Sequence, residues 1–433
     1  MKTTFIATGD AFITRHLPEK KYDGFEEIRE LINAHDFRFN NLEMTFHRQE
    51  GYPAASSGGT WAMTDPSMLD DMKAFGFNAY NTANNHSGDF GQEGILATIR
   101  HLNDRNMPFA GTGRTLQEAA RPLYVDLPES RVALIGITSS FDPAARAGGQ
   151  SGDMIGRPGL NPLRFSTVYH VTKEHFQMAQ ELARITLINW PIEQKIECGY
   201  AAPFPEGRMP FGKLNFVQDS KEFIETVPHQ GDLERTLESI REAKRQADIV
   251  VVSLHVHEMK GRSTTEPAQF HETFAHAAID AGASVVIGHG PHELRGIERY
   301  KDGLIFYSLG NFIFETETTE LQPYDAYVDM KLPTTMQVGE YMDYRSANGT
   351  RGFPVMPEIW EAIIPTWTIV DGKITDVKLY PIELGMKASR GVRGLPRLSR
   401  SEATLKRLGE LCRPFGTQIS IENGVGKLSL SKP

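Results

Sequence analysis

The stretch 284–292, Ser-Val-Val-Ile-Gly-His-Gly-Pro-His, joins a short apolar run to a polar turn that carries two imidazoles. The same arrangement, an apolar run that ends in a short polar group, occurs at four other places in the chain. The five polar groups are Gly9-Asp10, Asn41-Leu42-Glu43, Asn84-Asn85-His86, His255-Val256-His257-Glu258 and His289-Gly290-Pro291-His292.

Polar side chains at the ends of strands can meet at one edge of a sheet. In an open α/β sheet, the loops at the carboxyl ends of the strands line a single crevice. Carboxylate, amide oxygen and imidazole groups are ligands that borderline divalent metals accept. The five groups lie far apart in the sequence, and we therefore expect them to converge on one metal site.

The composition limits the class of protein. The chain has 433 residues, of which 40% are hydrophobic, which is enough for a large core and for two or three structural units. The formal net charge of −9 argues against a nucleic-acid partner, because such binding depends on neutralising phosphates. Two cysteines, Cys198 and Cys412, provide neither a disulfide framework nor a cysteine zinc site.

The sequence as given shows no targeting signal. No stretch reaches the roughly 20 apolar residues of a membrane span. The N-terminus also lacks the apolar core of roughly 7–15 residues that a secretory signal needs. We therefore expect a soluble, cytoplasmic protein with no membrane segment.

Strand-like and helix-like segments alternate over residues 1–143, which is typical of an α/β architecture. The alternation stops near Ala144, and glycines and prolines punctuate the chain to about residue 230, apart from one amphipathic helix near 173–187. It resumes at Asp232. We expect a core over residues 1–315 that carries an insertion, residues 144–230, near the site.

The C-terminal part has a different pattern. Residues 316–358 are polar and rich in turns, and we interpret them as a second excursion. The sequence Val370-Asp371-Gly372-Lys373 separates two apolar runs within 367–384, which predicts a hairpin. A helix near 401–412 and a small strand pair follow. We expect residues 316–433 to form this excursion plus a hairpin and helix extension that packs on the core.

Each polar group also has an ordinary structural explanation. Asp10 can cap a helix or a turn instead of holding a cation. Asn41 and Glu43 share one strand face because side chains alternate, so they can form a solvated strand end or present a carboxylate that bridges two cations. Adjacent asparagines such as Asn84 and Asn85 are common in turns.

The histidines favour the metal interpretation. His255 and His257 share one face at a strand tip, which favours a pair of ligands over a single structural histidine. His289 and His292 stand on a Gly-Pro turn, although two surface histidines in a turn would look the same. The co-occurrence of all five groups at predicted strand ends favours one shared metal site.

Several separate strings, in the same order, resemble the CapA family of poly-γ-glutamate capsule biosynthesis proteins. That family is similar to the calcineurin-like metallophosphoesterases. The resemblance covers roughly residues 3–143 and 231–315, with a weaker match near 367–427. The matching strings are Thr8-Gly9-Asp10, Asn41-Leu42-Glu43, Ala83-Asn84-Asn85-His86 followed by Asp89 and Gly91, Phe109-Ala110-Gly111-Thr112-Gly113-Arg114, and residues 286–314 with the sequence VIGHGPHELRGIERYKDGLIFYSLGNFIF.

The resemblance implies a fold and a set of site residues. The implied fold is an α/β sandwich of two mixed sheets flanked by helices, with insertions and a small C-terminal β-rich region. His86 corresponds to the family's catalytic imidazole, and Asp89 is placed to orient it. Asn41, His257 and Arg114 are weaker candidates for contacts to the substrate or to the ligands. The implied metal ligands are Asp10, Glu43, Asn85, His255, His289 and His292.

The sequence departs from the wider superfamily at two points. Phe12 stands where the superfamily has a histidine two residues after its first aspartate. The implied bridging carboxylate is Glu43, where the superfamily normally has an aspartate. Family members are often anchored in a membrane, and this sequence shows no anchor, which puts a role in capsule synthesis in question.

Two functions from different classes fit these residues. The first is a metal-dependent hydrolase that holds one or two divalent ions, Mn, Fe or Zn, and cleaves a small phosphorylated substrate with a metal-bridging hydroxide. In this function His86 stabilises or protonates the leaving oxygen. The second is a non-catalytic or polymer-handling component of poly-γ-glutamate capsule biosynthesis, in which the metal is structural or binds γ-glutamyl carboxylates. Fold analogy alone does not choose between them.

Overall fold

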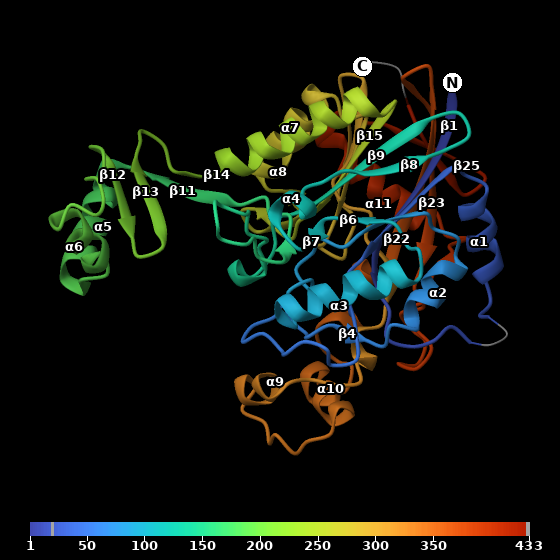
Figure 1. Cartoon of the computed structure of the whole chain (residues 1–433), viewed down its shortest axis with the longest axis horizontal. Helices are drawn as coiled ribbons and strands as arrows, with labels where there is room; N and C mark the ends of the chain where they lie inside the picture. The colour runs from blue at the N-terminus through green and yellow to red at the C-terminus, as the bar shows by residue number, and fades with distance from the viewer. Residues whose placement is uncertain (19–20, 430–433) are drawn as a thin grey trace.

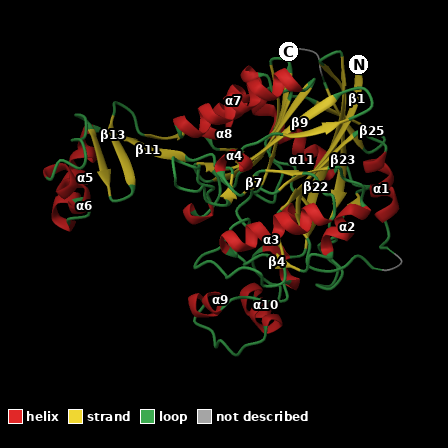
Figure 2. Cartoon of the chain, viewed as in Figure 1, coloured by secondary structure: helices red, strands yellow, loops and turns green. Residues whose placement is uncertain are grey.

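The computed structural model describes residues 1–18 and 21–429 (Figure 1). Over these residues the chain forms two large mixed sheets flanked by helices, and a smaller four-stranded sheet that projects to one side (Figure 2). The predicted α/β sandwich of two mixed sheets is confirmed.

The first large sheet supplies the strand that carries Asp10. Its strands are β1 (Lys2–Phe12), β2 (Phe37–Leu42), β5 (Ala79–Asn81), β6 (Phe109–Ala110), β21 (Asn311–Phe314), β22 (Glu361–Val370), β23 (Lys373–Glu383), β24 (Arg397–Leu398), β25 (Ile419–Glu422) and β26 (Val425–Leu428). The β1, β2, β5 and β6 strands run parallel, in that order. On the other side of β1, β22 and β23 pair antiparallel.

The second large sheet supplies two of the histidine strands. Its strands are β8 (Leu123–Asp126), β9 (Arg131–Thr138), β15 (Ile249–His255), β18 (Val285–His289), β19 (Ile297–Tyr300) and β20 (Gly303–Phe306). The central strands β9, β15, β18 and β20 are parallel. The sequence of β15, Ile-Val-Val-Val-Ser-Leu-His, is buried throughout, as expected for a parallel strand covered on both faces.

The two sheets pack face to face, and the strand period decides which residues meet. Phe5 on β1 and Val251 on β15 point into the layer between the sheets. Their neighbours Ile6 and Val250 point to the outer faces. Trp367 on β22 stacks on Phe5, with the ring centroids 5.3 Å apart, and closes the layer between the sheets.

Helices cover both outer faces (Figure 1). The core helices are α1 (Phe25–Asn33), α2 (Met68–Ala74), α3 (Gly91–Asp104), α4 (Leu116–Ala119), α7 (Gln230–Gln246), α8 (Gln269–Ala281) and α11 (Ala403–Cys412). Buried side chains of α1, α2 and α3 pack on the first sheet, and those of α7 and α8 pack on the second. No helix formed by residues 1–18 or 21–429 combines the length and the apolar composition that a bilayer crossing requires.

Residues 165–228 form the projecting part, which we call the module. Its elements are β11 (Phe165–Val171), α5 (Lys173–Thr186), α6 (Trp190–Glu197), β12 (Arg208–Phe211), β13 (Leu214–Gln218) and β14 (Phe223–Pro228). The strands lie in the order β12-β13-β11-β14, separate from both large sheets. The α5 helix confirms the helix predicted near 173–187, and Figure 1 shows the module extending away from the two sheets.

The C-terminal residues contribute to the first sheet itself. The hairpin predicted within 367–384 is present as β22 and β23, and the helix predicted near 401–412 is α11. The structure pairs β22 directly with β1. The physical reason is that this edge of β1 carries backbone groups that a strand can satisfy by hydrogen bonding.

The second excursion lies on the side of α3. Its helices are α9 (Tyr324–Asp329) and α10 (Val338–Ser346). Tyr327 and Tyr341 of these helices share a small apolar cluster with Trp61 and Phe90. Among the described residues, three short strand pairs lie outside the larger sheets: β3 (Thr45–Phe46) with β4 (Met63–Thr64), β7 (Thr112–Gly113) with β10 (Gly159–Leu160), and β16 (Met259–Lys260) with β17 (Ser263–Pro267).

Candidate metal centre

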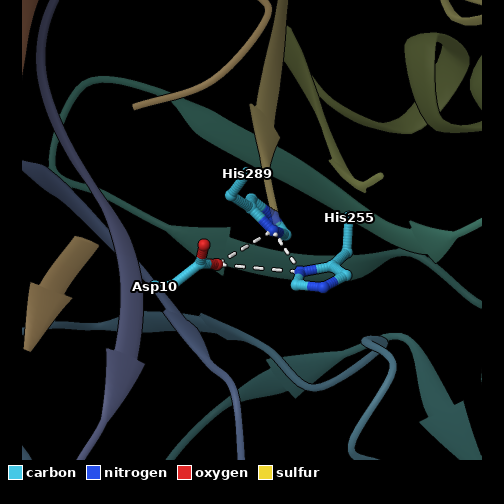
Figure 3. A group of neighbouring side chains, drawn as sticks. All are labelled: Asp10, His255 and His289. Carbon is cyan, nitrogen blue, oxygen red and sulfur yellow. Dashed lines mark hydrogen bonds and ion pairs between the residues drawn. The ribbon is translucent and has the colours of Figure 1, made fainter. Parts of the chain in front are cut away.

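Three side chains from three strands meet where the parallel strands end (Figure 3). Asp10 lies within β1, and His255 and His289 are the last residues of β15 and β18. The two histidine Nδ1 atoms lie 3.0 Å apart. They lie 3.7 Å (His255) and 3.5 Å (His289) from Asp10 Oδ1. All three side chains are buried, and together they form a group that could hold one metal ion.

The sheets explain why these three residues meet. His255 and His289 are register partners of adjacent parallel strands, so their side chains point the same way. Asp10 is held by two hydrogen bonds: its Oδ1 accepts the Asn41 amide at 2.7 Å, and its Oδ2 accepts the Gly290 N–H at 2.9 Å. Gly290 has a φ of 121°, which only glycine adopts readily.

A second group lies beside the first and consists of Glu43, His257 and His292, whose nearest ligand atoms are within 4.8 Å of one another. His292 Nδ1 is 3.7 Å from Glu43 Oε2, and His257 Nε2 is 4.0 Å from Glu43 Oε1. The side chain of His257 is 34% exposed, whereas that of Glu43 is fully buried. The second group is therefore the one that solvent reaches.

The imidazole of His255 connects the two groups. Its Nδ1 faces Asp10 and His289, and its Nε2 lies 3.1 Å from His257 Nε2 and 3.5 Å from Glu43 Oε1. The groups are therefore adjacent, and the residues present could hold two cations side by side.

Burial dominates the electrostatics of both groups. It raises the pKa of Asp10 to about 7, although the hydrogen bonds from Asn41 and Gly290 act in the opposite direction. Burial, with the nearby carboxylates of Asp10 and Asp89, raises the pKa of Glu43 well above its usual range. Burial also lowers the pKa of His289 to about 3. The imidazoles are therefore neutral at pH 7, which is the form that binds metals.

The donor set fits divalent cations. Both carboxylate oxygens of Glu43 are buried and have no hydrogen-bond partner among the described residues. A buried carboxylate without a partner is costly, and a bound cation offsets that cost. Two carboxylates and four neutral imidazoles are ligands suited to Mn, Fe or Zn.

Neighbouring polar groups orient two of the imidazoles. Ser253 Oγ lies 2.7 Å from His289 Nε2, which leaves Nδ1 toward Asp10. Asn311 donates both amide hydrogens to backbone carbonyls, so its oxygen accepts from His292 Nδ1 at 2.9 Å. Because that bond fixes the tautomer, His292 Nε2 keeps a free lone pair. His292 also has a φ of 61°, a left-handed conformation that is uncommon for residues other than glycine.

His86 and Asp89 form a buried pair next to the two groups. His86 Nδ1 lies 2.7 Å from Asp89 Oδ2, which also accepts the N–H of Ala62. The His86 ring meets Phe12 edge-on at 5.5 Å. Phe12 therefore lies against the imidazole of His86.

The structure brings the other sequence-predicted residues to different places. Asn41 accepts a hydrogen bond from Asn81 and donates to Asp10, so it contacts a ligand. The side-chain oxygen of Asn85 is buried and has no hydrogen-bond partner among residues 1–18 and 21–429, as a metal ligand would require. Arg114 is exposed and pairs with Glu118 in its own segment, so the structure does not bring it to the groups.

Sequence reasoning missed Ser253 and Asn311 and gave His257 only a secondary role. Ser253 is the polar residue in an otherwise apolar strand, two residues before His255, and that position on the ligand face was an available signal. Asn311 lies within the longest matching string but has no ligand spacing of its own. His257 follows the end of β15, so strand alternation no longer determines its direction.

Comparison with known proteins agrees with the resemblance. Residues 4–316 match the family described as "Bacterial capsule synthesis protein PGA_cap". An uncharacterized protein, y4sH, of Sinorhizobium fredii is 34% identical and covers 99% of this chain and 93% of its own length. The PGA biosynthesis protein CapA of Bacillus subtilis is 25% identical and covers 67% of this chain and 56% of its own length. The chain therefore belongs to the PGA_cap family of bacterial capsule synthesis proteins.

Proposed function

We propose that the protein is a metal-dependent hydrolase whose two adjacent groups hold two divalent cations. One observation carries the proposal: Glu43 is fully buried between imidazoles of both groups, and neither of its carboxylate oxygens has a hydrogen-bond partner among the described residues. A purely structural carboxylate in such a place would be hydrogen-bonded, because an unpaired buried charge is strongly unfavourable.

The residues divide into ligands and a proton donor. We assign Asp10, His255 and His289 to one cation and Glu43, His257 and His292 to the other, with Glu43 close enough to His255 to serve both. When bound, divalent cations supply a more acidic water and neutralise negative charge on the substrate. Asp89 holds the Nδ1 proton of His86, so His86 Nε2 is the atom that exchanges a proton with the leaving group.

The substrate class that we propose is a small phosphoester. Cations held among neutral imidazoles at the ends of the strands would attract and stabilise the negatively charged oxygens of a phosphoryl group.

A second candidate is a component that handles poly-γ-glutamate without catalysis. The family description and the name of the Bacillus subtilis relative favour it, because both refer to capsule or PGA biosynthesis. In that case the cations would bind γ-glutamyl carboxylates, and the pair His86–Asp89 would have no catalytic role.

One experiment separates the two candidates. Purified full-length protein is analysed for Mn, Fe and Zn, and is then assayed with bis-p-nitrophenyl phosphate before and after EDTA treatment. The hydrolase proposal expects one or two bound metals and turnover that EDTA abolishes and added Mn²⁺ restores. Stoichiometric metal without turnover of any phosphoester in a panel, together with retention of poly-γ-glutamate, would instead support the polymer-handling role.

A further inference from the structure

A cavity of about 190 Å³ lies between α10 and residues 351–356, and we call it the α10 cavity. Its apolar wall includes Met342 and Phe353, and its polar wall includes Arg345 and Arg351. The cavity is smaller than the roughly 300–1,000 Å³ of a typical small-molecule site. It is therefore large enough for one part of a ligand but not for a whole ligand of that kind.

Phe353 connects the α10 cavity to the second group of the candidate metal centre. Its ring lies in the wall of the cavity and packs edge-on against the ring of His292, with the centroids 5.8 Å apart. Phe314 supports both rings, at 5.0 Å from His292 and 5.2 Å from Phe353. A single aromatic side chain therefore contacts both the cavity and a candidate metal ligand.

Arg345 connects the cavity to the surroundings of Asn85. Its guanidinium donates a hydrogen bond to the hydroxyl of Thr60. Two residues earlier, Gly58 lies so close to Asn85 that a Cβ at this position would be 2.3 Å from the amide nitrogen. The Gly58 N–H also donates to the carboxylate of Asp89. The segment that holds Arg345 therefore contacts the candidate site directly.

The charges around the α10 cavity are not balanced. Among the described residues, no carboxylate pairs with Arg345 or with Arg351. Glu317 also lines the cavity, but its carboxylate already pairs with Arg393 and lies 3.7 Å from Arg390. The chain as a whole has a formal net charge of −9, so this local excess of positive charge runs against the overall balance. It favours an anionic ligand.

The two unpaired arginines differ in how they are held. Arg351 donates to the carbonyls of Tyr344 and Arg345 and thereby caps the C-terminal end of α10. Arg345 makes one side-chain hydrogen bond within the described part of the chain, to Thr60, whereas a guanidinium carries five N–H donors. Arg345 therefore has donors available to a ligand.

We propose that the α10 cavity binds a second anionic group of the substrate, a carboxylate or a phosphate on a short carbon chain, and that Arg345 holds this group. Arginine suits both groups, since its planar guanidinium forms paired hydrogen bonds with carboxylate and phosphate oxygens. The apolar wall formed by Met342 and Phe353 contacts the carbon chain. The inference rests on the proposed function, because the first anionic group binds at the cations.

The test compares phosphonates that differ only in a second anionic group. Alkylphosphonates carry one such group, ω-phosphonocarboxylates add a carboxylate, and α,ω-diphosphonates add a second phosphonate. A phosphoesterase does not cleave their carbon–phosphorus bonds, so binding to the Mn²⁺-loaded full chain can be measured by calorimetry. In a series of increasing chain length, at least one two-anion compound should bind about tenfold more tightly than its one-anion counterpart, as expected for a charged hydrogen bond. The compound that shows this gain identifies the second group as a carboxylate or a phosphate.

Three variants test the role of Arg345. Arg345→Gln should remove the gain and leave the affinity for alkylphosphonates unchanged, since the cations alone hold them. Arg345→Lys should lose part of the gain, because it keeps the charge but not the planar guanidinium. Arg241 is exposed on α7, and Arg241→Gln, the matched control, should retain the full gain. The Tm of each variant checks the fold, and if Arg345→Gln lowers the Tm, the partial loss in Arg345→Lys decides.

The outcomes separate this inference from the proposed function. A gain that is absent at every chain length, or that survives in Arg345→Gln, overturns the inference. An equal loss of affinity for one-anion and two-anion compounds also overturns it, because Arg345 would then act at the metal centre. Turnover of bis-p-nitrophenyl phosphate is measured separately, and its absence contradicts the hydrolase assignment without altering the binding result.

Discussion

The candidate metal centre and the module both place side chains in environments that disfavour them. The centre buries carboxylates, whereas the module exposes apolar side chains. The centre buries two carboxylates, Asp10 and Glu43, and leaves Glu43 without a hydrogen-bond partner among the described residues. The module exposes apolar residues such as Leu182 and Ile185. Exposed single apolar residues are common, whereas a buried unpaired charge or a continuous apolar row calls for a ligand or a partner.

The comparison teaches which kind of partner each region requires. At the centre the missing interaction is electrostatic, and the residues present could hold a cation that satisfies the carboxylate of Glu43. At the module the missing interaction is the burial of apolar surface, which another protein surface can provide. The two regions can therefore be disturbed separately, because the module forms its own sheet.

The largest expected effect comes from Glu43→Gln. A neutral amide is a poor ligand for two cations, so we expect loss of at least one metal equivalent and of all metal-dependent turnover. The elemental content of the purified variant and the shift of its Tm on EDTA treatment measure this. In the wild type, free metal at about 100 times its Kd should stabilise the fold by roughly 2.7 kcal/mol, and this stabilisation should shrink in the variant.

The matched control for Glu43→Gln is Glu50→Gln. Glu50 is exposed and pairs with Arg100 and His101, so its substitution should leave metal content unchanged. If Glu43→Gln retained full metal content and the same response to EDTA, Glu43 would not be a ligand. The buried carboxylate of Glu43 would then no longer indicate that the centre requires a cation.

The second-largest expected effect is a loss of catalytic rate with no loss of bound metal. His86→Ala should lower kcat by roughly 10²–10⁴, the range for loss of general acid–base help, while metal content stays near that of the wild type. The reason is that His86 is held by Asp89 and belongs to neither ligand group. His16→Ala is the matched control, since His16 forms a similar pair with Asp71 at the surface. Loss of metal in His86→Ala would show that His86 supports the ligands.

Much of the centre could be predicted from the sequence because the signal was local and repeated. An apolar run identifies a strand, and a polar residue at its end identifies the side of the sheet where loops meet. That reasoning anticipated the meeting of Asp10, His255 and His289. It could not assign His257 to a group, because the residue lies beyond the regular strand, where side-chain direction depends on the tertiary structure.

The module shows what the hydrophobic periodicity of a sequence cannot predict. The pattern predicted an amphipathic helix near 173–187. It could not tell that Phe176 is buried while Leu182 is exposed, because both positions are apolar and only packing against the sheet distinguishes them. Similarly, the C-terminal hairpin was predictable from local sequence, but its pairing with β1 is a contact between residues more than 350 positions apart, such as Lys2 and Val370.

The smallest expected effect tests the connection between the two regions. Asp232 on α7 is buried and accepts hydrogen bonds from Arg164, just before β11, and from Arg235. Burial alone would raise the pKa of Asp232, but these hydrogen bonds outweigh it and hold the pKa well below its usual range. Asp232→Asn should therefore lower the free energy of unfolding at pH 7 by about 1–3 kcal/mol, since a charged partner is lost.

The pH dependence of this effect follows from its sign. A carboxyl whose pKa is depressed in the folded state contributes its stability above the unfolded pKa of about 3.9, and loses it as the pH falls toward the folded value. The difference between wild type and Asp232→Asn in urea unfolding should therefore be largest near neutral pH and shrink at about pH 3. Glu242→Gln, on the exposed face of the same helix, should show a much smaller difference, because its ion pair with Arg245 is exposed to solvent. If the difference in the free energy of unfolding between wild type and Asp232→Asn stayed constant with pH, Asp232 would act through shape and hydrogen bonding rather than through its charge. The contact between Arg164 and Asp232 would then not stabilise the protein as an ion pair.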